Sequence, residues 1–192
     1  EKLGIQFEEK YTSIVDVEAG VEDAKWLFGS KLNIVDSCFQ NEDSAIVIVF
    51  QKEGGSLERV TQKELKDFVN KTANGFLEFG LSIGEKIAID MPMTLESVII
   101  YLAAIKSGLV VATIADSFSV EEIKTRLEIT KPKLVFTQDV FVRNGKVLSL
   151  YEKVNKAKSS KIIVVQTQKE KLPLEKGDMY YNDFLSSNVH FE

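Results

Sequence analysis

A proline that follows an apolar run near the middle of the chain constrains the fold more than any other feature. Residues 87–91 are mostly apolar and include two isoleucines, which is typical of a buried strand. Pro92 ends that strand, because proline lacks the N–H that a strand ladder needs and fixes its own φ. Thr94 can then cap a helix over residues 95–107, which is apolar on nearly all sides and therefore expected to be buried. The sequence predicts a strand, a sharp turn and a buried helix in succession.

The same alternation of strand and helix patterns continues on both sides of this unit. Three Ser/Thr-x-x-Glu capping boxes open helices, and Gly54 and Gly55 form a turn between two strands. The capping boxes begin at Thr61, Ser119 and Ser149, and the further strand patterns cover residues 45–50, 57–60, 109–114, 134–136 and 162–165. Strands separated by single helices require crossover connections, which produce a parallel sheet. The predicted fold class is α/β, a mostly parallel sheet with flanking helices.

The chain is predicted to have two parts. Residues 1–40 are acidic, and we expect them to form a helical N-terminal extension. Residues 41–192 contain the strand and helix patterns and form the predicted α/β subdomain.

Charge and composition exclude several classes of function. The net charge of −5 gives no general attraction for nucleic acid or an anionic membrane, so neither partner is expected. No apolar run is long enough to span a bilayer, and the acidic N-terminus does not read as a signal peptide. Cys38 has no second cysteine with which to pair, which fits an intracellular, reducing compartment. With one cysteine and one histidine, His190, neither a zinc site nor a Cys–His catalytic pair is predicted.

One candidate binding segment comprises Ala115, Asp116 and Ser117, between a predicted strand and the next helix. Ligands of open parallel sheets bind beyond the carboxyl ends of the strands, and a helix N-terminus favours an anion. The carboxylate of Asp116 would however repel a phosphate. The simpler alternative is that Asp116 and Ser119 only cap the helix.

A second candidate segment surrounds Asn144 and Gly145, which together are a strong turn signal. Arg143 and Lys146 flank this turn and could hold a phosphorylated ligand between a planar guanidinium and a mobile ammonium. The alternative is a solvated turn with two ordinary surface cations. No glycine-rich phosphate loop of either common type occurs in the sequence, and no residue is predicted to be catalytic or to bind a metal.

Five segments in the same order resemble the N-terminal part of acetyl-CoA synthetase-type, adenylate-forming enzymes. The segments are residues 26–33, 65–84 and 87–108, the pair Phe118 and Ser119, and the pair Arg143 and Lys146. The sequences of residues 89–94, 115–118 and 136–139 most resemble those of the plant peroxisomal acyl-activating branch of the family.

The resemblance implies a function for the whole enzyme. Members of the family use ATP, Mg and coenzyme A to convert a carboxylic acid to acyl-CoA, with release of AMP and pyrophosphate. In acetyl-CoA synthetases, the segments that match Ala115, Asp116, Ser117, Arg143 and Lys146 contact the 3′-phosphate end of coenzyme A. The resemblance therefore implies that these five residues bind coenzyme A, in a cytoplasmic or peroxisomal enzyme.

The sequence also departs from the family. Lys146 replaces the usual arginine, and residues 115–117 replace a Phe-Gly-Gly-like turn. The phosphate loop, the Tyr-Gly-x-Thr-Glu-like motif and the C-terminal lysine of the family have no counterpart here. We therefore expect an N-terminal fragment that is inert alone and requires no cofactor by itself. The alternative is a stand-alone α/β binding or interaction module.

An apolar sheet surface that the rest of such an enzyme would cover is expected to favour self-association. The apolar runs at residues 45–49 and 162–165 are the candidates for this surface.

Overall fold

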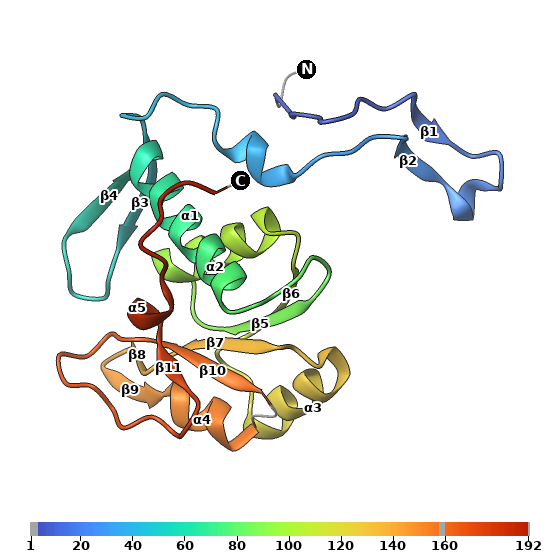
Figure 1. Ribbon diagram of the computed structural model, residues 1–192. Helices are drawn as coiled ribbons and strands as arrows, with labels where there is room; N and C mark the ends of the chain where they lie inside the picture. Colours follow the sequence, from blue (N-terminus) through green and yellow to red (C-terminus); the bar gives the residue numbers. More distant parts are fainter. Residues whose placement is uncertain (1–3, 158–159, 192) are drawn as a thin grey trace. The chain divides into compact units, whose positions relative to one another are not determined.

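The computed structural model describes residues 4–157 and 160–191 of the chain (Figure 1). The chain divides into two compact units, residues 1–40 and residues 41–192.

The described part of the first unit is built from a β-hairpin and two short 3-10 helices. Strand β1 (Ser13–Asp16) pairs antiparallel with β2 (Lys25–Phe28), and the 3-10 helices are η1 (Val21–Asp23) and η2 (Ile34–Cys38). The prediction of a helical N-terminal extension is therefore wrong. The β-branched and aromatic residues that lie opposite each other, such as Val15 and Trp26, favour a cross-strand pair over a helix.

The second unit begins with a two-stranded antiparallel ribbon. Strand β3 (Ile46–Gln51) pairs with β4 (Leu57–Thr61), and Gly54 adopts a left-handed φ of 74° in the turn, as the glycine pair predicts. On β3, Ile46 and Val49 stay about half exposed, consistent with one of the two predicted apolar surfaces.

A five-stranded parallel sheet forms the centre of the second unit. Its strands lie in the order β11-β10-β7-β5-β6. They are β5 (Lys86–Asp90), β6 (Val110–Ile114), β7 (Leu134–Gln138), β10 (Lys161–Val165) and β11 (Met179–Tyr180). The predicted α/β class and parallel sheet are confirmed. Residues 162–165 do not lie at an exposed boundary, because β10 is buried between β7 and β11.

Helices cover both faces of this sheet (Figure 1). Helices α3 (Val120–Thr130) and α4 (Leu150–Ala157) pack on one face, against residues that include Ala88, Val135 and Val164. Helices α1 (Gln62–Glu78), α2 (Leu95–Lys106) and α5 (Tyr181–Phe184) belong to the other face. A short hairpin of β8 (Val140–Arg143) and β9 (Lys146–Ser149) connects β7 to α4.

Side-chain caps fix where the helices begin. At α1 the Thr61 N–H donates to the Glu64 carboxylate at 2.8 Å, and the Glu64 N–H donates to the Thr61 hydroxyl at 3.2 Å. Ser119 and Glu122 form the same reciprocal pair at α3. Thr94 accepts the N–H of Ser97 at 3.2 Å at the start of α2. The predicted caps at Thr61, Thr94 and Ser119 are confirmed, and α4 begins directly after Ser149 as predicted.

An aromatic cluster joins α1, β7 and α5 on one face of the sheet. The rings of Phe76, Phe136 and Phe184 lie edge to face, with centroids 5.4–5.7 Å apart. Gly75 lets α5 approach α1 closely, because a Cβ at this position would lie 2.5 Å from the carbonyl oxygen of Phe184. The cluster therefore depends on a missing side chain as well as on the rings.

We predict that Gly75→Ala destabilises the protein. Alanine in the middle of a helix normally raises the free energy of unfolding by about 1 kcal/mol relative to glycine. Here the added methyl overlaps the Phe184 backbone, so we expect a net loss of about 1–3 kcal/mol in urea unfolding. The control Lys66→Ala, at an exposed position of α1, should stay within about 0.5 kcal/mol of wild type. A stabilised Gly75→Ala variant would contradict this packing of α1 and α5.

Candidate functional site

The carboxyl edge of the parallel sheet is the candidate site. Strand β5 lies between β6 and β7, and the chain passes from β6 across to β7 on the other side of β5. The order of strands therefore reverses between β5 and β7. In open α/β sheets, a crevice forms for ligands beyond the strand ends at such a switch point. Both candidate segments from the sequence follow strands of this region, residues 115–117 after β6 and the β8–β9 hairpin after β7.

The predicted Asn-Gly turn is confirmed in the β8–β9 hairpin. Asn144 and Gly145 have φ values of 51° and 71°, the left-handed conformation that two-residue hairpin loops prefer. Arg143 and Lys146 are direct partners across the hairpin, so their exposed side chains leave the ribbon on the same face. The Gly145 N–H donates to the Glu53 carboxylate at 3.3 Å. The turn thus holds two cations next to each other.

Neither cation is neutralised within the described part of the chain. The ion pairs found there involve other residues, and no carboxylate lies within 4 Å of the charged groups of Arg143 or Lys146. Like charges directly opposite each other on two strands repel. An anion bound between these two side chains would remove that repulsion.

The turn of Ala115, Asp116 and Ser117 is closed by a hydrogen bond from the Phe118 N–H to the Ala115 carbonyl at 3.0 Å. Ala115 and Ser117 are exposed and Asp116 is half-buried. The predicted cap by Ser119 is confirmed, whereas no hydrogen bond among the described residues joins the Asp116 side chain to α3. The backbone carbonyl of Asp116 instead accepts a hydrogen bond from the Lys153 ammonium on α4.

The two candidate segments are joined through α4. This helix starts directly after the hairpin that carries Arg143 and Lys146, and its Lys153 reaches the turn at Asp116. Among the described residues, no hydrogen bond or ion pair joins Arg143 or Lys146 to residues 115–117 directly.

Asp90 is a site residue that sequence reasoning missed. It is the last residue of β5 and fully buried, and neither carboxylate oxygen has a hydrogen-bond partner in the described part of the chain. The pairing of β5 with β7 ends at Ile89 and Phe136, and the next residue of β7 is Thr137, whose buried hydroxyl is also unpartnered among the described residues. A charged residue at the carboxyl end of an otherwise apolar strand was the signal that could have identified it.

Burial raises the pKa of Asp90 to about 7. The nearby Lys153 ammonium opposes this shift, and the Asp116 carboxylate adds to it. Near neutral pH, the charge of Asp90 is therefore sensitive to small changes in its surroundings.

Asp139 is also buried at this edge, but its carboxylate is fully used. It accepts the N–H groups of Val140, Thr167 and Gln168 at 2.7–3.1 Å and the hydroxyl of Thr167. It ties the segment after β7 to the segment after β10, which is a structural role.

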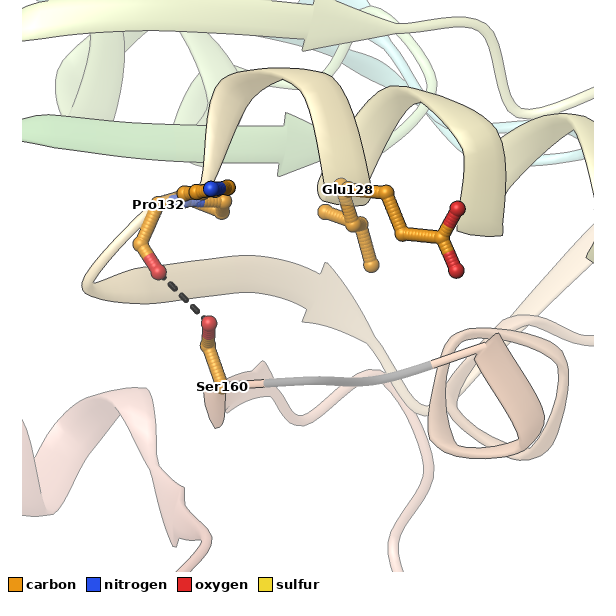
Figure 2. Close-up of a pocket in the computed structure, with 5 residues that line it drawn as sticks. Glu128, Pro132 and Ser160 are labelled. Carbon is orange, nitrogen blue, oxygen red and sulfur yellow. Dashed lines mark hydrogen bonds between the residues drawn. The ribbon is translucent and has the colours of Figure 1, made fainter.

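A surface depression lies at the amino ends of the strands, opposite the candidate site (Figure 2). Its lining includes Pro132 and Ser160, which precede β7 and β10, and the Ser160 hydroxyl donates to the Pro132 carbonyl at 2.5 Å. The amino ends of the strands are not where parallel sheets bind ligands. This depression is therefore not the candidate site.

The described residues contain no group of three or more His, Cys, Asp or Glu side chains placed to hold a metal ion. In the same part of the chain, no helix combines the length and the apolar composition needed to cross a bilayer.

Comparison with known proteins identifies the family. A family model described as AMP-binding enzyme matches residues 36–187. The chain belongs to this family. It is 40% identical over 176 residues to the probable acyl-activating enzyme 18, peroxisomal, of Arabidopsis thaliana, an alignment that covers 86% of this chain and 24% of that protein. It is 38% identical over 178 residues to the hexanoyl-CoA synthase of Cannabis sativa, with 88% of this chain and 25% of that enzyme covered.

The whole length of this AMP-binding family member matches part of a solved structure. The acetoacetyl-CoA synthetase from Streptomyces lividans aligns with a TM-score of 0.86 and 18% identity, covering 100% of this chain and 31% of that one. The resemblance to adenylate-forming acyl-CoA synthetases, and to plant peroxisomal acyl-activating enzymes in particular, is confirmed. The chain spans about a quarter of the length of the first relatives it matches.

We predict that Asp90 makes stability depend on pH. Its carboxyl is protonated in both states below about pH 4, and above that only the unfolded state ionises freely until the folded pKa of about 7 is reached. Stability should therefore fall as the pH rises through this window, by up to about 4 kcal/mol from this group.

Urea unfolding of wild type and Asp90→Asn across this pH range tests the prediction. The advantage of the variant should grow with pH and level off above about pH 7. Asp183→Asn removes an exposed carboxylate and should show a much smaller trend. Parallel curves for wild type and Asp90→Asn would contradict the prediction.

Proposed function

We propose that this chain supplies part of the coenzyme A-binding face of an AMP-forming acyl-CoA ligase. The observation that carries the proposal is the β8–β9 hairpin, where Arg143 and Lys146 face the same side across a left-handed Asn-Gly turn. Two adjacent cations that have no carboxylate partner among the described residues suit a phosphate monoester, because each can make a charge-assisted hydrogen bond to it. The 3′-phosphate of coenzyme A is such a group.

The turn of Ala115, Asp116 and Ser117 is proposed as the second contact. The exposed Ala115 and Ser117 can approach the nucleotide, and the Asp116 carbonyl is already used by Lys153. The Asp116 carboxylate would repel a phosphate, so we assign this turn to the adenosine part of the ligand. We assign the phosphate to the hairpin, where the two cations outnumber the one carboxylate of Glu53 that accepts the Gly145 N–H.

In the complete enzyme, the proposed reaction joins a carboxylic acid to coenzyme A at the expense of ATP, with Mg²⁺. We place the adenylation chemistry outside this segment. The support is that the sequence has no glycine-rich phosphate loop and that the described residues offer no metal-binding group. The acyl substrate is not assigned.

A second candidate function is an interaction module without catalysis. It is favoured by the β1–β2 hairpin, where Ile14 and Trp26 are 61% and 71% exposed. In the second unit, the half-exposed residues of β3 separately support the expected self-association.

We predict that the 192-residue chain alone catalyses no ATP–pyrophosphate exchange with acetate or hexanoate. Stabilisation of charge on the transferring phosphates dominates this type of catalysis, and the chain lacks a loop to provide it. Incorporation of labelled pyrophosphate into ATP measures the exchange, with a full-length acetyl-CoA synthetase as positive control. Carboxylate-dependent exchange by the chain itself would contradict the prediction.

We predict that 3′-phospho-ADP binds at the hairpin with a dissociation constant of about 1 mM, equivalent to about −4 kcal/mol. Two charged hydrogen bonds contribute about 1.5–3 kcal/mol each, and the entropy of association removes part of this. An NMR titration should shift the amides around Asn144 and Gly145. Arg143→Ala should weaken binding about tenfold or more, and added salt should weaken it further.

Arg59→Ala is the matched control, because Arg59 is an exposed arginine on the β3–β4 ribbon. It should bind like wild type. Shifts that cluster elsewhere, or that persist unchanged in Arg143→Ala, would leave the hairpin as a solvated turn.

A further inference from the structure

Lys153 connects the two segments of the proposed coenzyme A site. It lies in α4, which follows β9 without an intervening loop. Its ammonium donates a hydrogen bond to the backbone carbonyl of Asp116 in the turn after β6. This contact spans elements that are 37 residues apart in the sequence and come from opposite sides of β5.

The helix that carries Lys153 is itself firmly anchored. Tyr151 and Val154 are buried in the core between the sheet, α3 and α4. The Tyr151 N–H donates to the Asp139 carbonyl at 3.3 Å, and its hydroxyl donates to Asp178 at 2.9 Å. Because its neighbours on both sides are fixed, Lys153 extends from a rigid base toward the turn.

Asp90 is the last residue of β5, the strand that lies between β6 and β7. Within the described part of the chain its carboxyl is fully buried without a hydrogen bond, and the charges there that affect its pKa are Lys153 from α4 and Asp116 from the turn. Thr137 of β7 adds a neutral hydroxyl at the same level of the sheet. When Asp90 is ionised, its charge attracts the Lys153 ammonium through space, although the ion pairs of the described residues do not include these two groups.

We propose that Lys153 is a positioning residue for coenzyme A, fastening the Ala115–Ser117 turn to α4 and thereby to the Arg143–Lys146 hairpin. This inference rests on the proposed function and adds a residue that itself touches no ligand. A nucleotide held by two separate loops must order both of them when it binds. A fixed link between the loops orders them before the ligand binds, and so lowers the entropy that is lost on binding.

The test is an NMR titration of the chain with 3′-phospho-ADP, comparing wild type with Lys153→Met. Methionine keeps most of the aliphatic stem and removes the ammonium. Loss of this one hydrogen bond should weaken binding about three- to tenfold. The shifts at Asn144 and Gly145 should persist at saturation, whereas the ligand-induced shifts at residues 115–117 should shrink. The control Lys156→Met, at an exposed position of the same helix, should bind like wild type.

A second variant and a second measurement distinguish a positioning role of Lys153 from a general loss of folded structure. Lys153→Arg keeps the charge and the donor, and should bind within about twofold of wild type. The titration of the Asp90 side-chain carboxyl, followed by carbon NMR, should move to higher pH in Lys153→Met and stay in place in Lys156→Met.

The outcomes distinguish this inference from the proposed function. If Arg143→Ala weakens binding but Lys153→Met binds like Lys156→Met, the positioning role is overturned and the coenzyme A site stands. If Arg143→Ala leaves binding unchanged, the site itself is overturned, and the role of Lys153 falls with it. Weaker binding in Lys153→Met, rescue in Lys153→Arg and the shifted Asp90 titration together establish the role.

Discussion

The pairing of β5 on both of its edges is the constraint on which the rest of the structure depends. Its register with β6 and with β7 places the carboxyl ends of the three strands at one level. The proposed site depends on this alignment of the strand ends, because the turn after β6, the hairpin after β7 and Asp90 all lie at the carboxyl ends of these strands. The apolar residues of β5 alternate between the two helical layers, so a shift of one residue would exchange the buried faces and move Asp90 away from Lys153.

Local sequence signals predicted most of the second unit. Capping boxes, the Asn-Gly turn and the proline after β5 act over four or five residues, and such short-range chemistry can be read directly from a sequence. The N-terminal unit was predicted wrongly, because an acidic composition says little about helix or strand. There the cross-strand pair of Val15 and Trp26 decides, and it joins residues from two separate segments.

The candidate site was predictable only in part, for the same reason. Arg143 and Lys146 are neighbours in sequence as well as in space, so their pattern is visible in one short segment. The sequence could not show that Lys153 reaches Asp116 or that both lie near Asp90, since these contacts depend on strand order. Asp90 reads as one polar residue in an apolar strand until the register with β6 and β7 is known.

Two buried aspartates at this edge have opposite roles, and hydrogen bonding explains the difference. The Asp139 carboxylate is surrounded by N–H donors and the hydroxyl of Thr167, so it fixes the backbone at the start of the β8–β9 hairpin. Such support is needed, because an isolated two-stranded hairpin is at best marginally stable and Val147 and Leu148 are exposed on this one. Among the residues that the structure describes, Asp90 has no such donors, and its interaction with Lys153 is electrostatic attraction without a hydrogen bond. A buried carboxyl in that situation lowers the stability of the fold once it ionises, so a contribution to stability does not explain its place at the switch point.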